Sequence, residues 1–499
     1  MASDSSAAPR PPVPLPGVCP EHPRHSGTAP GVRLDSAQGR WLLAAAILGS
    51  GMGFLDGTVV NVAIKRIGTD IGASLADLQW VVNGYLLMLA ALILVGGSLG
   101  DRFGRKRLFL IGVIWFAVAS AVCGLANSPA VLIGARVVQG IGAAMLTPGS
   151  LSMIQGAFVR EDRARAIGTW SGLAGVTTAL GPLVGGWLVQ TASWRYVFWI
   201  NIPLAAIVIA IGVHHIPETS DPQASHHLDL PGVVLGAVGL GAVTYALIEA
   251  GTRSSAEVAV AAVVGVLALT AFVLVERHGR EPLVPPSIFS SRVFLFSNVL
   301  TFVVYGALGA LMFMLVLQLQ VVTGWTPLEA GLSTLPVTVL MLLFSGRSAA
   351  LSARIGPRTQ MTAGPVVCGL GALLLSRVGA GESYWLGVLP GVVLFGIGLT
   401  LMVAPLTATV MAAAEDRYAG TASGVNNAIA RAGSLLAVAA LPALVGLSGA
   451  DYAKPAVFGN GFTSSMYICA ALLFAGGIAG WMALRPTGPG AAPSPSPPR

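Results

Sequence analysis

Charged residues are scarce in this sequence: Asp, Glu, Lys and Arg make up 10% of its 499 residues, whereas hydrophobic residues make up 54%. Soluble domains carry about 25% charged residues. So few charges cannot cover a water-facing surface of this size, and the composition therefore excludes an ordinary soluble protein. The 63 glycines and 32 prolines agree with this, because both residues are commoner in membrane helices than in soluble ones.

Cysteine is also rare, with four residues at Cys19, Cys123, Cys368 and Cys469. They show no pairing pattern and no metal-ligand spacing, and three lie in apolar runs, which favours small buried hydrophobes. The phosphate-binding string Gly-x-x-x-x-Gly-Lys-Ser/Thr is missing, so uphill transport would have to draw on an ion gradient. The histidines at 214–215 and 226–227 match no zinc spacing. We therefore expect neither a cofactor nor a metal.

Long apolar runs dominate the chain. A membrane-spanning helix needs about 17–25 mostly apolar residues. Fourteen such runs lie near 41–64, 79–100, 108–126, 129–153, 165–190, 196–213, 232–250, 256–275, 293–322, 328–350, 360–377, 385–411, 418–447 and 463–484. The runs at 232–250 and 256–275 give the weakest signal, because charged residues lie between them. The sequence predicts an all-α integral membrane protein with 14 transmembrane helices.

The runs also suggest how the chain is divided. Residues 1–40 contain Pro and Ser but no apolar signal-peptide core, which predicts a disordered cytoplasmic tail, and 485–499 predict a second one. Between the tails we expect four segments: an N-terminal six-helix half (41–214), a cytoplasmic loop (215–231), two inserted linker helices (232–275) and a C-terminal six-helix half (293–484).

The positive charges are distributed unevenly across the predicted membrane. Of 28 Lys and Arg residues, twenty fall on the side of the N-terminus and six on the opposite side, while Arg136 and Arg431 lie inside spans. The positive-inside rule therefore predicts that both termini are cytoplasmic in a multi-pass protein of the cell membrane. The net charge of +7 comes from short loops, so this rule explains it better than a nucleic-acid partner does.

The most specific string is the loop Gly97-Ser98-Leu99-Gly100-Asp101-Arg102-Phe103-Gly104-Arg105-Lys106-Arg107. Spaced glycines let helix ends approach closely, and Asp101 can pair with a cation or cap a helix. Topology alone would require only Lys and Arg, so we interpret the loop as a gate. Its candidate residues are Gly97, Gly100, Asp101, Arg102, Gly104, Arg105 and Lys106. A weaker copy at 354–358 indicates two similar halves with a solute site between them.

This loop resembles the signature loop of the major facilitator superfamily, and the resemblance covers nearly the whole chain. The segments 54–63, 79–87, 136–144, 181–186 and 193–203 resemble motifs of its fourteen-helix drug:proton antiporter branch. The resemblance implies a major-facilitator fold of two six-helix halves plus two extra central helices. It also implies a proton-coupled antiporter for multidrug or antibiotic efflux.

Three departures from the family pattern concern local gating. The first-helix motif usually continues Ala-Leu-Pro, whereas this chain has Ala63-Ile64-Lys65-Arg66. Thr177 stands where the fifth-helix motif often carries glycine, and the loop at 354–358 lacks an acid that matches Asp101.

Asp56 and Arg136 break the apolar rule most clearly. An ionisable residue inside a span costs about 2.5–3.5 kcal/mol on insertion scales, so it is usually functional or paired. Burial disfavours the carboxylate form of Asp56, which suits reversible protonation. Gln139 follows Arg136 at i+3, and the resemblance assigns both to proton transfer. We predict that Asp56, Arg136 and Gln139 couple protons to transport; a purely structural ion-pair network is the alternative.

Gly181, Pro182, Gly185 and Gly186 predict a hinge. Proline removes a backbone hydrogen bond, and the glycines permit bending and close packing. A simple packing groove would account for the same residues. In the family this motif accompanies antiport, so we favour a hinge.

Polar residues in other spans are candidates for a substrate cavity. The predicted set is Asp56, Asn61, Asn83, Tyr85, Gln320, Asn427 and Arg431. Asn427 and Arg431 are four apart and share a helical face. Gln318 and Gln320 are two apart, so only one can face a cavity, and the family pattern favours Gln320. Each of these side chains could instead make an interhelical hydrogen bond.

Together these features predict a monomeric secondary active transporter that works by alternating access in the lipid bilayer. Protons would drive export of small amphipathic compounds, hydrophobic or cationic. A dedicated exporter of one endogenous metabolite or lipid fits the same sequence. A membrane solute sensor or enzyme is a remote alternative, because we see neither a convergent nucleophile and base nor a signalling domain.

Overall fold

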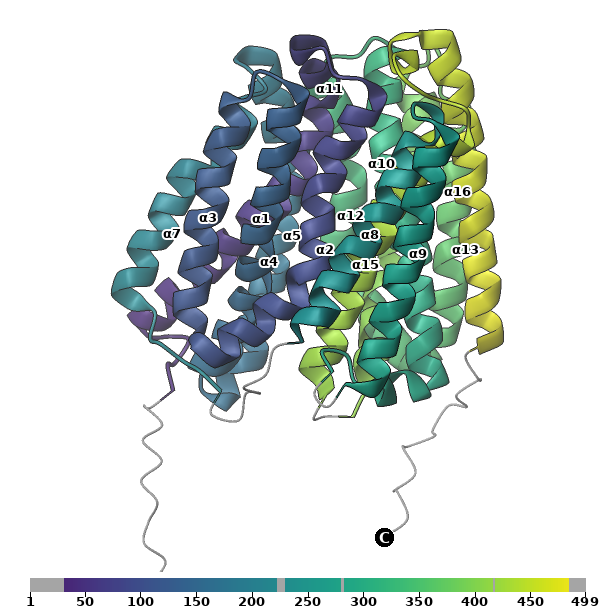
Figure 1. The fold of residues 1–499 in the computed structure, drawn as a ribbon. Coiled ribbons are helices and arrows are strands. Elements are labelled where there is room, and N and C mark those ends of the chain that lie inside the picture. Colours follow the sequence, from purple (N-terminus) through teal and green to yellow (C-terminus); the bar gives the residue numbers. More distant parts are fainter. Residues whose placement is uncertain (1–30, 222–228, 280–281, 416–417, 484–499) are drawn as a thin grey trace, which may run out of the picture.

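Membrane-length helices dominate the computed structural model, which describes residues 31–221, 229–279, 282–415 and 418–483 (Figure 1). In these ranges, thirteen helical segments are long and apolar enough to cross a membrane. Helix α13 (Pro357–Leu375) provides the fourteenth. Its start, Pro-Arg-Thr-Gln, lowers its hydropathy, yet it packs against α14 (Leu389–Ala412) and α16 (Pro455–Ala483). The prediction of an all-α membrane protein with fourteen spans is confirmed.

The first group of helices precedes residue 216. It comprises α1 (Ala37–Ile71), α2 (Leu75–Phe103), α3 (Arg105–Leu125), α4 (Pro129–Ala157), α5 (Arg160–Thr191), and the broken span α6 (Tyr196–Trp199) with α7 (Asn201–His215). Helix α1 thus begins inside the segment 1–40 that we predicted to be a tail. Residues 1–30 of that segment and the predicted tail at 485–499 lie outside the described residues.

A helical hairpin and a second large group follow. The hairpin is α8 (Leu230–Ile248) and α9 (Ser255–His278). The second group is α10 (Arg292–Val321), α11 (Pro327–Ser333), α12 (Leu335–Ile355), α13, the short π-helix η3 (Tyr384–Val388), α14, α15 (Ala419–Leu444) and α16. We refer to α1–α7 as the first half and to α10–α16 as the second half.

The chain termini distinguish the two ends of the helical bundle. Helix α1 begins and α16 ends at the same end, which we call the terminus face; the opposite end is the far face (Figure 1). Short polar turns at the far face start new helices by capping. Ser74 with Asp77 forms a reciprocal capping box for α2, and Thr326 with Glu329 forms one for α11. These caps satisfy helix N–H groups that would otherwise lack partners.

Two glycines give the related loops of the two halves the same backbone. Gly104, between α2 and α3, has φ 106° and ψ 126°; Gly356, between α12 and α13, has φ 81° and ψ 153°. Residues with a side chain rarely adopt such positive φ values. Each glycine lets one helix end and the next begin within a single residue, which supports the internal repeat seen in the sequence.

The two halves are joined at the far face. Gln79 of α2 donates to the carbonyls of Val438 and Ala439 on α15 at 2.7 and 3.0 Å. Gln320 of α10 donates to Val62 of α1 at 2.9 Å. The largest buried apolar cluster contains residues of both halves, whereas the second largest is built from residues before 217.

The halves separate toward the terminus face, as one side of α5 shows. A Cβ on Gly186 would lie 2.6 Å from the Cα of Leu328 on α11. Gly168 lies five helical turns earlier on the same side of α5, and no atom would come within 4 Å of its Cβ. Between them, Gly175 would only reach Leu342 of α12, at 3.8 Å. Along α5, the two halves are therefore in contact at the far face and farther apart toward the terminus face.

The α8–α9 hairpin lies over one junction between the halves. Helix α8 packs against both α2 and α15, and α9 packs against α8 (Figure 1). The rings of Trp80 on α2 and Tyr245 on α8 are 6.4 Å apart. Both helices correspond to the two apolar runs with the weakest predicted span signal.

Candidate functional site

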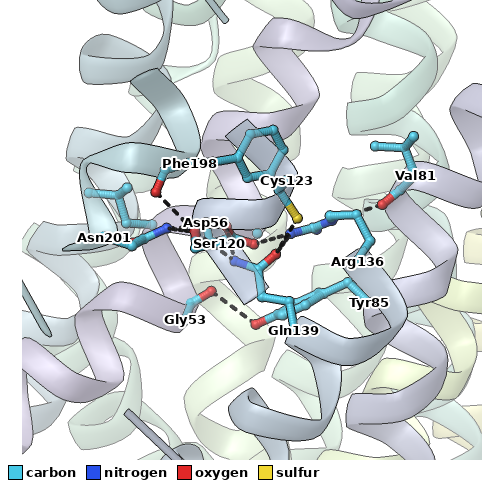
Figure 2. A network of polar contacts seen from close by, with 12 residues as sticks. Gly53, Asp56, Val81, Tyr85, Ser120, Cys123, Arg136, Gln139, Phe198 and Asn201 are labelled. Atoms are coloured by element: carbon cyan, nitrogen blue, oxygen red, sulfur yellow. Dashed lines mark hydrogen bonds and ion pairs between the residues drawn. The ribbon is translucent and has the colours of Figure 1, made fainter. Parts of the chain in front are cut away.

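A buried network of charged and polar side chains fills the centre of the first half (Figure 2). Asp56 on α1 has no exposed surface. It accepts a hydrogen bond from Arg136 of α4 in a direct ion pair, and a second one at 2.9 Å from the Nε2 of Gln139. Asn201 of α7 donates a third, at 3.4 Å. The three predicted coupling residues are thus brought together.

Arg136 is held on every side. Its Nη1 also donates to Gln139 Oε1 at 2.7 Å, and its Nε donates to the carbonyl of Val81 on α2 at 2.9 Å. The guanidinium carbon lies 4.4 Å from the centre of the Tyr85 ring and 5.8 Å from that of Phe198. Cation–π contacts of this kind strengthen when water is excluded. Helices α1, α2, α4 and α6 therefore fix one position for this charge.

Ser120 and Asn201 belong to the network, although the sequence did not single them out as site residues. Ser120 of α3 accepts from Gln139 at 3.2 Å and from Asn201 at 3.0 Å, and donates to the carbonyl of Phe198 at 2.9 Å. Both side chains are fully buried. Asn201 Oδ1 has no hydrogen-bond partner within the described residues. Among the described residues, the network thus contains a buried oxygen that can accept a further hydrogen bond.

The Asp56–Arg136 pair has no net charge, so the loss of either charge leaves the other one unbalanced. Breaking a buried ion pair by removing one partner costs about 3–5 kcal/mol, because the other charge remains buried without a partner. Protonation of Asp56 would have the same effect on Arg136 without any mutation. A proton that reaches Asp56 would therefore release Arg136 and disturb four helices at once.

The predicted gating loop is tied to the segment that follows α7. Asp101 and Arg105 form an ion pair at 2.8 Å. Glu218 accepts from the backbone N–H groups of Lys106 and Arg107 at 3.0 and 3.1 Å, at the positive N-terminus of α3. The Arg105 N–H also donates to the carbonyl of Thr219 at 2.8 Å. Glu218, which the sequence did not indicate, caps α3.

The other residues of the predicted gating loop lie near the Asp101–Arg105 ion pair. The Arg102 guanidinium lies 4.7 Å from the Phe103 ring centre. The Nζ of Lys106 donates to the carbonyl of Val213 at 3.1 Å. A Cβ on Gly97 would meet Pro148 of α4 at 3.8 Å, and one on Gly100 would meet Leu108 at 3.6 Å. Both distances are ordinary van der Waals contacts, so close packing does not require glycine at either position in this structure.

The fifth-helix motif packs tightly against two helices. A Cβ on Gly181 would lie 1.9 Å from Thr58 Oγ1, and one on Gly185 would lie 2.9 Å from Val59. Pro182 faces α11, where a Cβ on Gly331 would lie 2.3 Å from the Pro182 carbonyl oxygen. The motif therefore forms part of the contact that closes the far face. A hinge at these residues remains a prediction.

The predicted cavity residues in the first half lie in different surroundings. Asp56 and Tyr85 belong to the buried network, and the Tyr85 hydroxyl donates to the carbonyl of Gly53 at 3.3 Å. Asn83 is fully buried, and both of its side-chain polar atoms lack partners within the described residues. Asn61 is partly exposed and donates to Gly57 at 3.4 Å.

The predicted cavity residues in the second half are likewise spread out. Gln320 is buried and bridges to α1, while Gln318 points the other way and donates to Val378 at 2.7 Å. Asn427 is exposed and donates to Ser423 at 3.1 Å, and Arg431 is partly buried. Gln320 thus lies at the far-face contact between the halves.

A bundle of two helical halves, closed at one face and enclosing a charged pair, is the architecture of a secondary transporter. The Major Facilitator Superfamily matches residues 46–438, and the chain belongs to this superfamily. It is therefore a multi-pass integral membrane transporter and not an enzyme.

Relatives at about one-third identity cover most of the chain. The methylenomycin A resistance protein of Bacillus subtilis (strain 168) is 35% identical over 448 residues, which are 88% of this chain and 94% of that protein. The tetracenomycin C resistance and export protein of Streptomyces glaucescens is 34% identical, over 81% of this chain and 75% of that protein. The multidrug resistance protein Stp of Mycobacterium tuberculosis (strain ATCC 25618 / H37Rv) is 35% identical, over 80% and 74%.

Solved structures share the fold at much lower identity. An auto-inhibited peptide transporter of the POT family superposes with a TM-score of 0.65 and 16% identity, covering 89% of this chain and 96% of that one. A bacterial homologue of the human lysosomal transporter Spinster superposes with a TM-score of 0.64 and 17% identity over the same shares.

Proposed function

We propose that this protein is a proton-coupled antiporter that exports drugs, antibiotics or similar amphipathic compounds. The observation that carries the proposal is the buried Asp56–Arg136–Gln139 network, in which protonation of one carboxylate would release a charge held by four helices. The names of the relatives supply the substrate class, because all three describe resistance or export.

The driving force is adequate for this role. Each charge that crosses 100 mV is worth about 2.3 kcal/mol, and each pH unit adds about 1.4 kcal/mol per proton. Breaking the ion pair costs an amount of the same size, about 3–5 kcal/mol. One proton at Asp56 can therefore shift the balance between two arrangements of the halves.

We also propose that the terminus face is cytoplasmic. The clusters Arg102–Arg107 and Arg160–Arg165 flank helices at this face, and Arg354 and Arg358 do so in the second half. Short loops rich in Lys and Arg stay in the cytoplasm. The open end of the described structure would then face the cytoplasm, which suits loading of an exported compound.

The substrates in this proposal are hydrophobic, because the spans offer mostly apolar side chains. A cationic substrate would need an unpaired carboxylate, and Asp56 is paired with Arg136 in this structure. Cation preference would therefore show that Asp56 leaves Arg136 during the cycle.

The test is transport by the purified protein in proteoliposomes with an imposed pH gradient. Cationic, neutral and anionic amphiphiles form the panel, and substrate-driven proton movement is followed with a pH-sensitive dye. The Asp56→Asn variant keeps the size and shape of the side chain and its capacity for hydrogen bonding. Its amide cannot take up and release a proton. We expect it to abolish coupled proton movement.

Asp35→Asn provides the matched control, because Asp35 precedes α1 and makes only an exposed ion pair at 3.6 Å with Arg165. It should leave coupling unchanged. Proton movement of normal size in Asp56→Asn would refute the role of Asp56.

A further inference from the structure

Arg431 lies on the side of α15 that faces the first half. Two contacts on the same side define this: a Cβ on Gly424 would lie 2.5 Å from Leu94 of α2, and the Val438 carbonyl accepts from Gln79 at 2.7 Å. Arg431 is seven residues from each of them, which is close to two helical turns. Its side chain therefore projects toward α2 from the middle of the span, between the two halves.

Within the part of the chain that the structure describes, the charge of Arg431 has no partner. Within the described residues, no hydrogen bond or ion pair joins it to another side chain or carbonyl, and its Nε is buried without a partner. The other arginine inside a span, Arg136, is paired with Asp56 and fully buried. An unpaired charge inside a membrane protein is costly and usually marks a functional site. The difference between the two arginines therefore requires an explanation.

None of the ion pairs among the described residues includes Arg431. Asp56 is the acid inside the first half, and Arg136 already neutralises it. Within the described residues, Arg431 therefore adds a positive charge without an acidic partner to the region between the halves. This environment favours an anion that comes from outside the chain.

We propose that Arg431 binds an acidic group, a carboxylate or a similarly acidic oxygen, on the exported compound. A guanidinium presents a planar fork of N–H donors that matches two oxygens of a carboxylate, and it stays charged at all relevant pH values. Asn427, one turn nearer the terminus face, is exposed. The acidic group would pair with Arg431 while the apolar body of the compound occupies the space between the halves.

This inference rests on the proposed export function but makes a separate claim, since an exporter of neutral compounds would leave Arg431 without this role. Asp56 would carry the proton and Arg431 would select the substrate, so the two charges would serve different steps. Loss of Arg431 should therefore change which compounds are transported and leave proton coupling to neutral compounds in place.

The experiment uses the purified full-length protein in proteoliposomes. It measures the transport of matched pairs of probes in the direction of export. Each pair consists of a hydrophobic fluorescent carboxylic acid, such as pyrenebutyric acid, and its primary amide. The two members differ in charge and hardly in size. We expect the wild-type protein to bind and transport acids in preference to amides by at least about tenfold.

Arg431→Gln should remove this preference, and the ratio of acid to amide transport is the readout, so that a general loss of activity does not count as support. Arg431→Lys keeps the charge without the fork and should retain part of the preference. Arg377→Gln, which removes an exposed arginine beyond the end of α13, is the matched control and should retain all of it. An equal or lower affinity for acids in the wild-type protein, or an unchanged acid preference in Arg431→Gln, would overturn the proposal.

The two claims fail in different ways. If pH-driven transport of every probe is absent, the proposed antiport is wrong and acid binding is judged from equilibrium binding of the same pairs. If transport is present without an acid preference, the antiport stands and the role of Arg431 is wrong.

Discussion

The two halves have related folds but differ in the polar groups that hold their helices together. The first half encloses an ion pair between Asp56 and Arg136, linked through Gln139 to Ser120 and Asn201. The second half holds its helices with neutral groups. Asn426 of α15 donates to Asn298 and Thr301 of α10 at 3.1 and 2.9 Å.

The related loops show the same contrast. Gly104 and Gly356 have similar dihedral angles, but Asp101 pairs with Arg105 only in the first loop. In the second, Arg358 packs over Trp481 at 3.8 Å from its ring centre and donates to its carbonyl. A shared fold therefore carries one half with a buried ion pair and one half stabilised by packing and neutral hydrogen bonds.

Removing one charge from the first half should produce the largest effect. Arg136→Ala leaves Asp56 buried and unpaired, which costs about 3–5 kcal/mol in the free energy of unfolding. Asn426→Ala removes a neutral interhelical cluster, which costs about 1–2 kcal/mol. Denaturant unfolding in detergent, followed by tryptophan fluorescence, measures both values. Equal losses would contradict the contrast between the halves.

Filling the far-face contact should have an intermediate effect. A side chain at Gly331 would meet the Pro182 carbonyl, because a Cβ there already comes within 2.3 Å. Overpacking of this kind costs about 1–3 kcal/mol, so Gly331→Val should reduce the closed population by roughly 5–150-fold. Labelling of Val62→Cys from the far side reports this opening.

Gly168→Val is the matched control for that change, since a Cβ at Gly168 has no neighbour within 4 Å. It should leave the labelling rate unchanged. Faster labelling in Gly168→Val than in Gly331→Val would show that the far-face contact is not what closes the structure.

The loops should give the smallest difference. Asp101→Asn removes a partly exposed ion pair, and pairs of this kind contribute about 0.2–1 kcal/mol, so the transport rate should fall by up to about fivefold. Arg358→Gln changes the related loop without breaking an ion pair and should have a smaller effect. Initial transport rates in proteoliposomes measure both. A larger loss in Arg358→Gln would reverse the assignment of the gate to the first half.

The sequence was informative where a residue contradicts its surroundings. Apolar runs of membrane length predicted the spans, including α8 and α9. Asp56 and Arg136 stood out because charges are rare inside such runs, and the i+3 spacing placed Gln139 beside Arg136. In these cases a local pattern in one helix sufficed.

It was less informative where the partner comes from another helix. Ser120 and Asn201 are neutral polar residues of a kind common in membrane helices, and only the packing of α3 and α7 around α1 makes them neighbours of Asp56. Gln320 was predicted to line a cavity, and its hydrogen bond to the Val62 carbonyl depends on how α10 packs against α1, which the sequence does not show. Glu218 caps α3 because the segment after α7 lies against the N-terminus of α3, and this contact is not apparent from the sequence.

The α8–α9 hairpin makes the two lateral seams of the transporter unequal. It covers the seam between α2 and α15, whereas the seam between α5 and α12 is bordered by exposed residues such as Leu180 and Leu343. Among the described residues, the hairpin therefore shields one lateral junction between the halves from the surrounding lipid and leaves the other without such a cover.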